Sequence, residues 1–136
     1  MAAEGLGGPL GRGRASGRLW LGLGGLNGAL AVAVMAATAH GRLASGGAEL
    51  AEIGARFELM HAILLVALSV AARVWTSRFI DLSAALVAAG CVLFSGGLYL
   101  DALTATGAFL VPIGGLCFIL GWLCLAGAAL RERAVA

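Results

Sequence analysis

Four long apolar stretches dominate this chain and leave it few possible folds. They cover residues 19–39, 57–75, 80–100 and 109–130, and each is close to the roughly 20 apolar residues that a helix needs to cross a bilayer. Lipid offers no hydrogen bonds to a bare backbone, so spanning stretches of this kind must be helical. Since 61% of the residues are hydrophobic and only 12% are charged, we predict an all-α integral membrane protein.

The distribution of arginine predicts how the spans are oriented. If residues 19–130 form a four-helix bundle with up-down topology, both chain ends lie on one side of the membrane. Seven arginines then fall on that side, namely Arg12, Arg14, Arg18, Arg73, Arg78, Arg131 and Arg133. Only Arg42 and Arg56 fall on the other side. Because basic residues concentrate in cytoplasmic segments, we expect an N-in, C-in orientation.

The two chain ends are predicted to lie outside the bundle. Residues 1–18 are rich in glycine and arginine and offer little to bury, which is typical of a flexible cytoplasmic tail. Residues 131–136 form a second, short cytoplasmic tail. Residues 12–39 also resemble a signal peptide, with Ala37-Thr38-Ala39 as a cleavage-like site. Because this apolar run is near full spanning length and three more spans follow, we expect it to be retained.

Small residues are predicted to hold the helices together, because lipid is as apolar as leucine and membrane helices associate by close packing. Asn27 is expected to hydrogen-bond to a neighbouring helix, and Pro112 can open the fourth helix without losing a helical hydrogen bond. The complete set of predicted packing residues is Gly24, Asn27, Gly28, Ser95, Gly96, Pro112, Gly114, Gly115, Gly121 and Trp122.

A set of polar residues is predicted to gather at the outer ends of the spans, because those ends meet there in an up-down bundle. The set is His40, Glu58, His61, Tyr99 and Asp101. Each member can be a boundary residue or a hydrogen-bonding partner of a neighbouring helix. Alternatively, imidazole and carboxylate groups suit several divalent metals, and two histidines on adjacent helices can ligate haem. No HxxxH or CxxCH spacing supports these alternatives, so no cofactor is expected and the identity of any metal is open.

Other features argue against several classes of function. Cys91, Cys117 and Cys124 fall inside apolar runs without CxxC spacing, and we expect them to be small buried hydrophobes. Ser95 and the threonines have no activating base at mid-membrane depth, and no phosphate-binding loop is present, so an enzyme is not expected. A net charge of +2 is too small and too scattered to indicate a nucleic-acid partner.

Several motifs resemble one known family. They are ATAHGRL around His40, FELMHAILL around His61, VLFSGGLYLDALT from Val92 to Thr104, and PIGGLCFILGWLCLAG from Pro112 to Gly127. Their order and spacing resemble the family called domain of unknown function 423, whose animal member is transmembrane protein 256. The resemblance covers roughly residues 22–127. It implies a compact four-span protein of the bacterial inner membrane or its mitochondrial counterpart, and it implies no particular activity.

The family pattern maps onto both histidines and most of the predicted packing residues. The matched positions are His40, Gly41, His61, Ser95, Gly96, Tyr99, Pro112, Gly114, Gly115, Gly121 and Trp122. The chain departs from the pattern at Phe57 and Glu58, where the family has a glutamine- and tyrosine-rich approach to the histidine. It also has Val111 where the family often has threonine before the proline.

These observations favour a structural or accessory subunit of a membrane complex. Besides the lipid bilayer, the expected partners are a larger membrane-protein complex or further copies of the chain, in the bacterial inner membrane. The alternative is a binding protein for a metal, haem or a small amphiphile at the outer polar residues. A small transporter is a weaker hypothesis, because four-span multidrug exporters need a membrane-embedded carboxylate and the first span contains none.

Overall fold

The structure, a computed structural model, describes residues 9–41, 45–75 and 77–132, and its regular elements are all helical. The α-helices are α1 (Pro9–Ala39), α2 (Ser45–Val74), α3 (Arg78–Gly90), α4 (Gly96–Thr104) and α5 (Val111–Glu132). A π-helical turn, η1 (Cys91–Ser95), joins α3 to α4, and a 3-10 turn, η2 (Ala108–Leu110), precedes α5.

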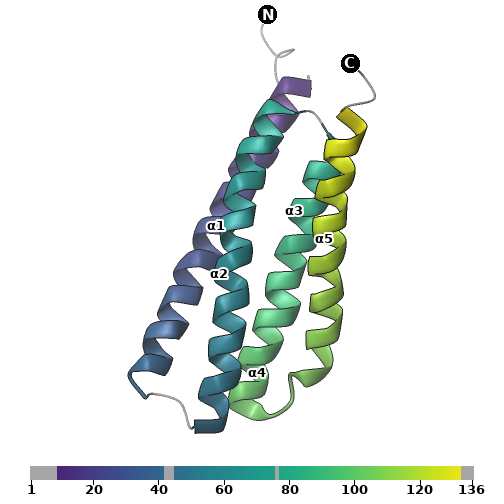
Figure 1. The fold of residues 1–136 in the computed structure, drawn as a ribbon. Helices are drawn as coiled ribbons and strands as arrows, with labels where there is room; N and C mark the ends of the chain where they lie inside the picture. Colours follow the sequence, from purple (N-terminus) through teal and green to yellow (C-terminus); the bar gives the residue numbers. More distant parts are fainter. Residues whose placement is uncertain (1–8, 42–44, 76, 133–136) are drawn as a thin grey trace, which may run out of the picture.

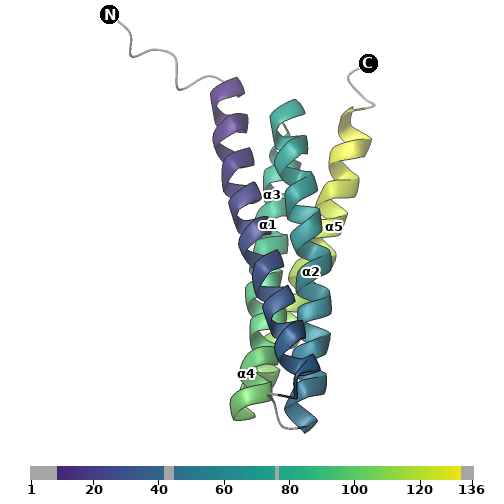
Figure 2. The same ribbon diagram turned by 90° about the vertical axis from the view of Figure 1, so that its left-hand side faces the viewer.

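Four helical segments are long and apolar enough to cross a membrane, as the sequence predicts. They are Ala15–Ala39, Gly46–Val74, Arg78–Thr104 and Ala108–Arg131. Figure 1 shows that α1 begins and α5 ends at the same end of the elongated molecule. In the view from the side of α1, α1 and α2 lie in front of α3, α4 and α5 (Figure 2).

Helix α2 is the central element of the bundle. It packs along α1 on one side and along α3, η1 and α4 on the other, and its side chains also reach α5. In an apolar stretch of 18 residues within α2, 44% of the residues are buried. In stretches of the same length within α1 and α5, 17% are buried. The outer helices α1 and α5 therefore present most of their surface to the surroundings.

Two helices begin earlier than the sequence analysis expects. α1 already begins at Pro9, so the predicted flexible tail is too long: residues 9–18 are helical, and residues 1–8 lie outside the described part. Proline at the first position of a helix loses no hydrogen bond and has a suitable φ. α2 begins at Ser45 rather than at residue 57, because the polar segment before the span continues the same helix. At the other end, α5 includes Arg131 and Glu132, and residues 133–136 are not described.

The third span is one helix interrupted by a π-helical turn. The backbone N–H of Gly96 donates to the carbonyl of Cys91, five residues earlier, which is the π pattern. The helix ends at Ala105, a non-glycine residue with a left-handed φ of 56°. Its N–H donates to the carbonyl of Asp101 at 2.9 Å, so the helix end is closed by a backbone hydrogen bond.

The apolar core lies towards the end where α2 stops and α3 starts. We call this region the apolar half. Its buried members are Leu64, Leu65, Leu68, Ala72, Ile80, Ala84, Val87 and Ala128, and Trp20 and Leu23 of α1 pack against them. Its side chains come from α1, α2, α3 and α5, so one apolar cluster joins both sides of the bundle.

The predicted packing glycines differ in how closely they approach a neighbouring helix. A Cβ at Gly114 would clash with the backbone of Phe94, and one at Gly24 would lie 2.9 Å from the Val66 side chain. A Cβ at Gly121 would lie 2.9 Å from the side chain of Val87. At Gly28 and Gly115, by contrast, the nearest atoms are 3.8 Å and 3.7 Å away, which is ordinary contact.

Three of the predicted packing residues do not contact a neighbouring helix in the way the sequence predicts. They are Gly96, Asn27 and Pro112. Nothing lies within 4 Å of a Cβ built at Gly96, because the π turn rotates this residue off the packed face. The Asn27 amide donates to the carbonyl of Leu23 in its own helix at 2.8 Å, instead of to a neighbouring helix. Pro112 is the second residue of α5 and is exposed; it lies in the first turn, where proline is tolerated.

Candidate functional site

Beyond the apolar half, the interior of the bundle becomes polar and aromatic. We call this region the polar–aromatic cluster and define it by Glu58 and His61 of α2, Phe94 and Ser95 of η1, Tyr99 of α4, and Phe118 and Trp122 of α5. Trp122 lies at its edge and is 51% exposed. The three polar side chains Glu58, His61 and Ser95 are only 2%, 6% and 0% exposed. Buried polar groups of this kind need partners within the protein.

Glu58 and Tyr99 join α2 to α4 through a short hydrogen bond. The Tyr99 hydroxyl donates to a Glu58 carboxyl oxygen at 2.5 Å. Gly54, one turn before Glu58, makes room for the tyrosine, because a Cβ there would lie 2.9 Å from its ring. The glycine and the carboxylate together allow the tyrosine to approach α2 closely enough to bond.

His61 is held on three sides. Its Nδ1 lies 2.7 Å from the carbonyl oxygen of Phe57, its ring stacks on Phe118 with centroids 3.6 Å apart, and Trp122 Nε1 donates to its Nε2 at 3.4 Å. A carbonyl can only accept and an indole N–H can only donate. Both bonds therefore require the tautomer with its proton on Nδ1, which leaves Nε2 free to accept.

Aromatic rings surround these hydrogen bonds. Phe57 contacts Phe94 with centroids 4.7 Å apart, and Phe94 lies 5.6 Å from Phe118. Phe118 and Trp122 are one turn apart on α5, so both face His61. Phe94 and Phe118 are not among the packing or polar residues predicted from the sequence. The signal that could have indicated Phe118 is its i, i+4 spacing from Trp122, which puts both on one face of the helix.

Ser95 differs from the other polar members of the cluster. Among the described residues, its hydroxyl is the one buried side-chain polar atom without a hydrogen-bond partner. It lies one turn before Tyr99 and one turn after Cys91, on the face that packs against α2. By comparison, the buried Ser83 hydroxyl donates to the Gly121 carbonyl at 2.8 Å.

The structure brings together only part of the predicted outer polar set. Glu58, His61 and Tyr99 lie in the cluster, whereas His40 is exposed at the end of α1. Asp101 accepts a hydrogen bond from the Gly107 N–H at 3.2 Å and closes the loop before α5. His61 lies about 24 Å along α2 from Ser45, so the two histidines do not face a common site.

Glu58 is also more buried than the sequence predicts. The prediction puts it at the solvated entrance of the second span, but α2 starts at Ser45 and Glu58 is about 20 Å from that start, at about 1.5 Å per residue. It is 2% exposed, so it is a buried group and not a solvated boundary charge.

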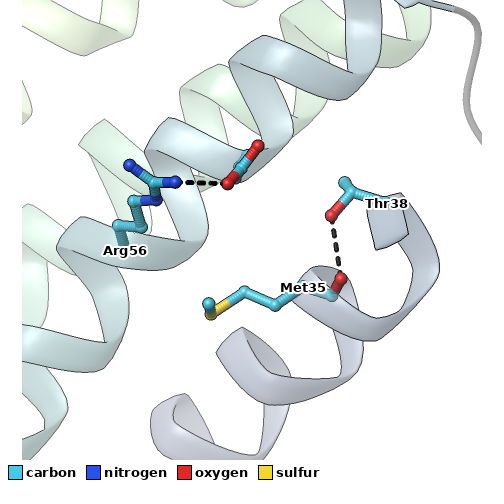
Figure 3. Close-up of polar contacts among 4 residues, drawn as sticks. Met35, Thr38 and Arg56 are labelled. Atoms are coloured by element: carbon cyan, nitrogen blue, oxygen red, sulfur yellow. Dashed lines mark hydrogen bonds and ion pairs between the residues drawn. The ribbon is translucent and has the colours of Figure 1, made fainter. Parts of the chain in front are cut away.

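A separate pocket of about 270 Å³ lies near the end of α1 and the start of α2. It is lined by Met35, Thr38, Ala39, Ala48, Glu49 and Glu52. Figure 3 shows the two polar contacts beside it, in which Thr38 donates to the Met35 carbonyl at 2.9 Å and Arg56 pairs with Glu52 at 2.5 Å. The Glu52–Arg56 pair is the i, i+4 contact that helical spacing favours.

The residue types that bind metals are dispersed. No group of three or more histidine, cysteine, aspartate or glutamate side chains is arranged to hold a metal ion within the described part of the chain. The three cysteines are all free, with Cys91 buried and Cys117 and Cys124 partly exposed. The contacts within the polar–aromatic cluster link α2 to α4 and α5.

Comparison with known proteins identifies the family. The family described as "Protein of unknown function (DUF423)" matches residues 30–115. This chain belongs to that family. The resemblance inferred from the motifs around His40, His61 and Pro112 is thereby confirmed.

Curated relatives agree with this assignment. A UPF0382 membrane protein of Haemophilus influenzae is 31% identical over 115 residues, covering 81% of this chain and 92% of its own length. A UPF0382 membrane protein of Staphylococcus epidermidis, SERP0230, is 36% identical over 115 residues, covering 80% and 93%. The UPF0382 inner membrane protein YgdD of Escherichia coli K12 is 33% identical over 84 residues, covering 60% and 64%. No solved structure matches this chain.

Together with the four spanning-length helices, the names of these relatives establish the location. The chain is a multi-pass inner-membrane protein. The family description assigns no activity, so any function must be argued from the geometry of the bundle.

Proposed function

We propose that the protein is a structural or accessory subunit of a larger membrane-protein assembly and that it is not an enzyme. The observation that carries this proposal is the open face of α1. This helix packs mainly along α2, and it reaches α3 through Trp20, whose Nε1 donates to Asp81 at 3.0 Å. The face of α1 that points away from α2 is exposed along the whole described span.

Small residues lie on two opposite faces of α1, although only one of these faces packs against α2. On the covered face, Gly17, Gly24 and Ala31 are buried against α2. On the open face, a second row of small residues is exposed, namely Gly22, Gly25, Ala29, Ala33 and Ala36. A Cβ at Gly22 or Gly25 would meet nothing within 4 Å. Small residues at three- and four-residue spacing let membrane helices approach closely, so this face suits a helix better than lipid chains.

The exposed surface of α5 offers a contrast. Large aliphatic side chains are exposed on both helices, such as Leu26 on α1 and Ile119 on α5. On α5, however, they are not accompanied by a row of exposed glycines, since Gly114, Gly115, Gly121 and Gly127 are buried or partly buried. Large aliphatic groups fill the space between lipid chains, whereas glycine leaves backbone uncovered. A partner helix is therefore expected at α1 and lipid at α5.

The polar–aromatic cluster supports a structural role. Several of its polar groups form hydrogen bonds with other groups of the same chain. They are the Tyr99 hydroxyl, both ring nitrogens of His61 and the Trp122 indole N–H. These contacts hold the helices in register, and holding them in register requires no ligand.

We also infer that successive spans alternate in direction, with both chain ends in the cytoplasm. The support is the gathering of Arg18, Arg73, Arg78 and Arg131 at the end where α1 starts and α5 stops, together with the cytoplasmic bias of basic residues. Reporter fusions at the two termini should both report the cytoplasm. Reporters in opposite compartments would overturn this orientation.

Site-specific photo-crosslinking in native membranes tests the subunit role. A photoreactive phenylalanine in place of Ala29 on α1 should give a discrete protein adduct, identifiable by mass spectrometry. The same group in place of Ile119 on α5 should give only lipid adducts. No protein adduct from Ala29, or equal adducts from both positions, would contradict the proposal.

A matched pair of variants tests whether the small side chains matter. Gly25→Leu should abolish co-purification of the crosslinked partner in mild detergent, while thermal stability is not lowered, because its Cβ meets nothing and leucine favours a helix more than glycine does. Gly46→Leu near the start of α2, which is equally open, should keep the partner. Retention of the partner by Gly25→Leu would show that the open face does not contact it.

A further inference from the structure

Four exposed arginines gather at the end of the bundle where the apolar half lies. They come from four different helices: Arg18 from α1, Arg73 from α2, Arg78 from α3 and Arg131 from α5. We call this set the arginine end. We propose that the arginine end binds the phosphate groups of anionic phospholipids.

These guanidinium groups are not neutralised by carboxylates of the described part of the chain. The ion pair found among the described side chains, Glu52–Arg56, lies near the opposite end of α2. Asp81 is the acidic side chain described at the arginine end, and its carboxylate accepts the indole N–H of Trp20. As far as the described side chains go, the four positive charges are therefore available to an external anion.

Two of the four side chains are held in place by packing. Arg73 lies over Gly17 of α1, where an added Cβ would come within 2.9 Å of its Cγ and Nε. The guanidinium carbon of Arg131 lies 5.5 Å from the centre of the Phe79 ring of α3, which is the distance of a cation–π contact. Because each spans two helices with its head still exposed, less side-chain freedom is lost when an anion binds.

Neighbouring groups favour a lipid phosphate at this position. Trp75, which is 50% exposed, lies between Arg73 and Arg78 in sequence, and tryptophan is typical of the headgroup level of a bilayer. α3 begins here at Arg78, and the side chain of Ser77 before it makes no capping hydrogen bond, so the first N–H groups of that helix add positive potential. Guanidinium groups bind phosphate oxygens in bidentate fashion.

The opposite end of the molecule has the reverse charge balance. There the described side chains include Glu49, Glu52 and Asp101 against Arg56. By the charges of the described side chains, an anionic surface would be attracted more strongly to the arginine end than to the opposite end. This asymmetry makes the arginine end a selective surface for anionic headgroups, and the inference does not depend on the subunit role proposed above.

The test is the relative affinity for anionic and zwitterionic lipid. The full chain is reconstituted in vesicles of phosphatidylcholine mixed with phosphatidylglycerol, and brominated acyl chains on one lipid or the other quench tryptophan fluorescence. We expect phosphatidylglycerol to bind at least about fivefold more tightly, since each basic residue near an anionic surface contributes about 1 kcal/mol. Raising the salt concentration should reduce this preference.

A quadruple variant with Arg18, Arg73, Arg78 and Arg131 changed to glutamine should lose most of the preference. Arg56→Gln, at the opposite end, is the matched control and should keep it. If the quadruple variant does not fold, as judged by helical circular dichroism, the double variant Arg78→Gln with Arg131→Gln should still lose part of the preference.

Three outcomes would overturn the proposal. One is equal affinity of the unaltered chain for the two lipids. Another is an equal loss in Arg56→Gln and in the quadruple variant. The third is loss of the preference in added orthophosphate but not in chloride of the same ionic strength, since this would assign the surface to free phosphate instead of lipid.

Discussion

The apolar half and the polar–aromatic cluster stabilise the same bundle by different means. In the apolar half, leucine, alanine and valine side chains pack without directional bonds. Lipid chains offer these side chains a similar environment, so only close contact favours the helix over lipid. In the cluster, the bonds Tyr99–Glu58 and Trp122–His61 require one rotation and one register of each helix. The comparison suggests that the apolar half supplies contact area and the cluster specifies alignment.

The largest expected effect comes from a close helix approach, and each region offers one. In Gly114→Ala, the new methyl group would clash with the backbone of Phe94, and overpacking against a backbone should lower the free energy of unfolding by about 3 kcal/mol. In the apolar half, Gly121→Ala would meet mainly the Val87 side chain, which can move, so the loss should be smaller. Titration with SDS in mixed micelles, followed by circular dichroism, measures both.

Gly96→Ala is the control for this pair. Nothing lies within 4 Å of its added methyl group, and replacing glycine by alanine inside a helix should stabilise by about 0.5–1 kcal/mol. A loss in Gly96→Ala as large as that in Gly114→Ala would show that helix approach is not the cause.

The next effect tests whether the hydrogen bonds of the cluster specify alignment. Tyr99→Phe removes the donor to Glu58 and leaves a buried carboxyl group without this partner, which should cost about 2 kcal/mol of unfolding free energy. Glu58→Gln keeps an acceptor oxygen and should cost less. If Tyr99→Phe is neutral in the same SDS titration, the 2.5 Å contact contributes nothing to stability.

Two buried serines give a smaller and opposite pair of effects. Ser83 donates to the Gly121 carbonyl, so Ser83→Ala should lose about 1 kcal/mol. Ser95 has a buried hydroxyl without a partner, so Ser95→Ala should be neutral or slightly stabilising. Equal losses in the two variants, measured by thermal unfolding in detergent, would indicate that the Ser95 hydroxyl does have a partner.

The smallest effect is expected at the exposed Glu52–Arg56 pair. The two side chains are 44% and 65% exposed, and exposed pairs of this kind contribute at most about 0.5 kcal/mol. Arg56→Gln should therefore leave the midpoint of SDS unfolding almost unchanged. A large shift would mean that this end of α2 contributes more to alignment than the cluster does.

The sequence alone determined the class of the fold and the family. The length and hydropathy of the four stretches are local properties, and in lipid they admit only helices; the order of the motifs around His40, His61 and Pro112 was enough to indicate the family. Sequence did not determine where the helices begin. The segments before Leu19 and Phe57 are outside the apolar stretches, and hydropathy does not show whether a helix continues into them. Sequence also put Glu58 at a solvated position, although the residue is buried and bonded to Tyr99 of α4.

Only the tertiary structure decided which polar residues meet. The sequence predicts that His40 and Asp101 lie together with Glu58 at the outer ends of the spans. In the structure, His40 is exposed at the end of α1 and Asp101 bonds to the loop before α5, so neither belongs to the polar–aromatic cluster. The stacking of His61 on Phe118, the unpartnered hydroxyl of Ser95 and the open row of small residues on α1 depend on the rotation of each helix about its axis. That rotation is set by contacts between residues far apart in sequence, and no local pattern contains it.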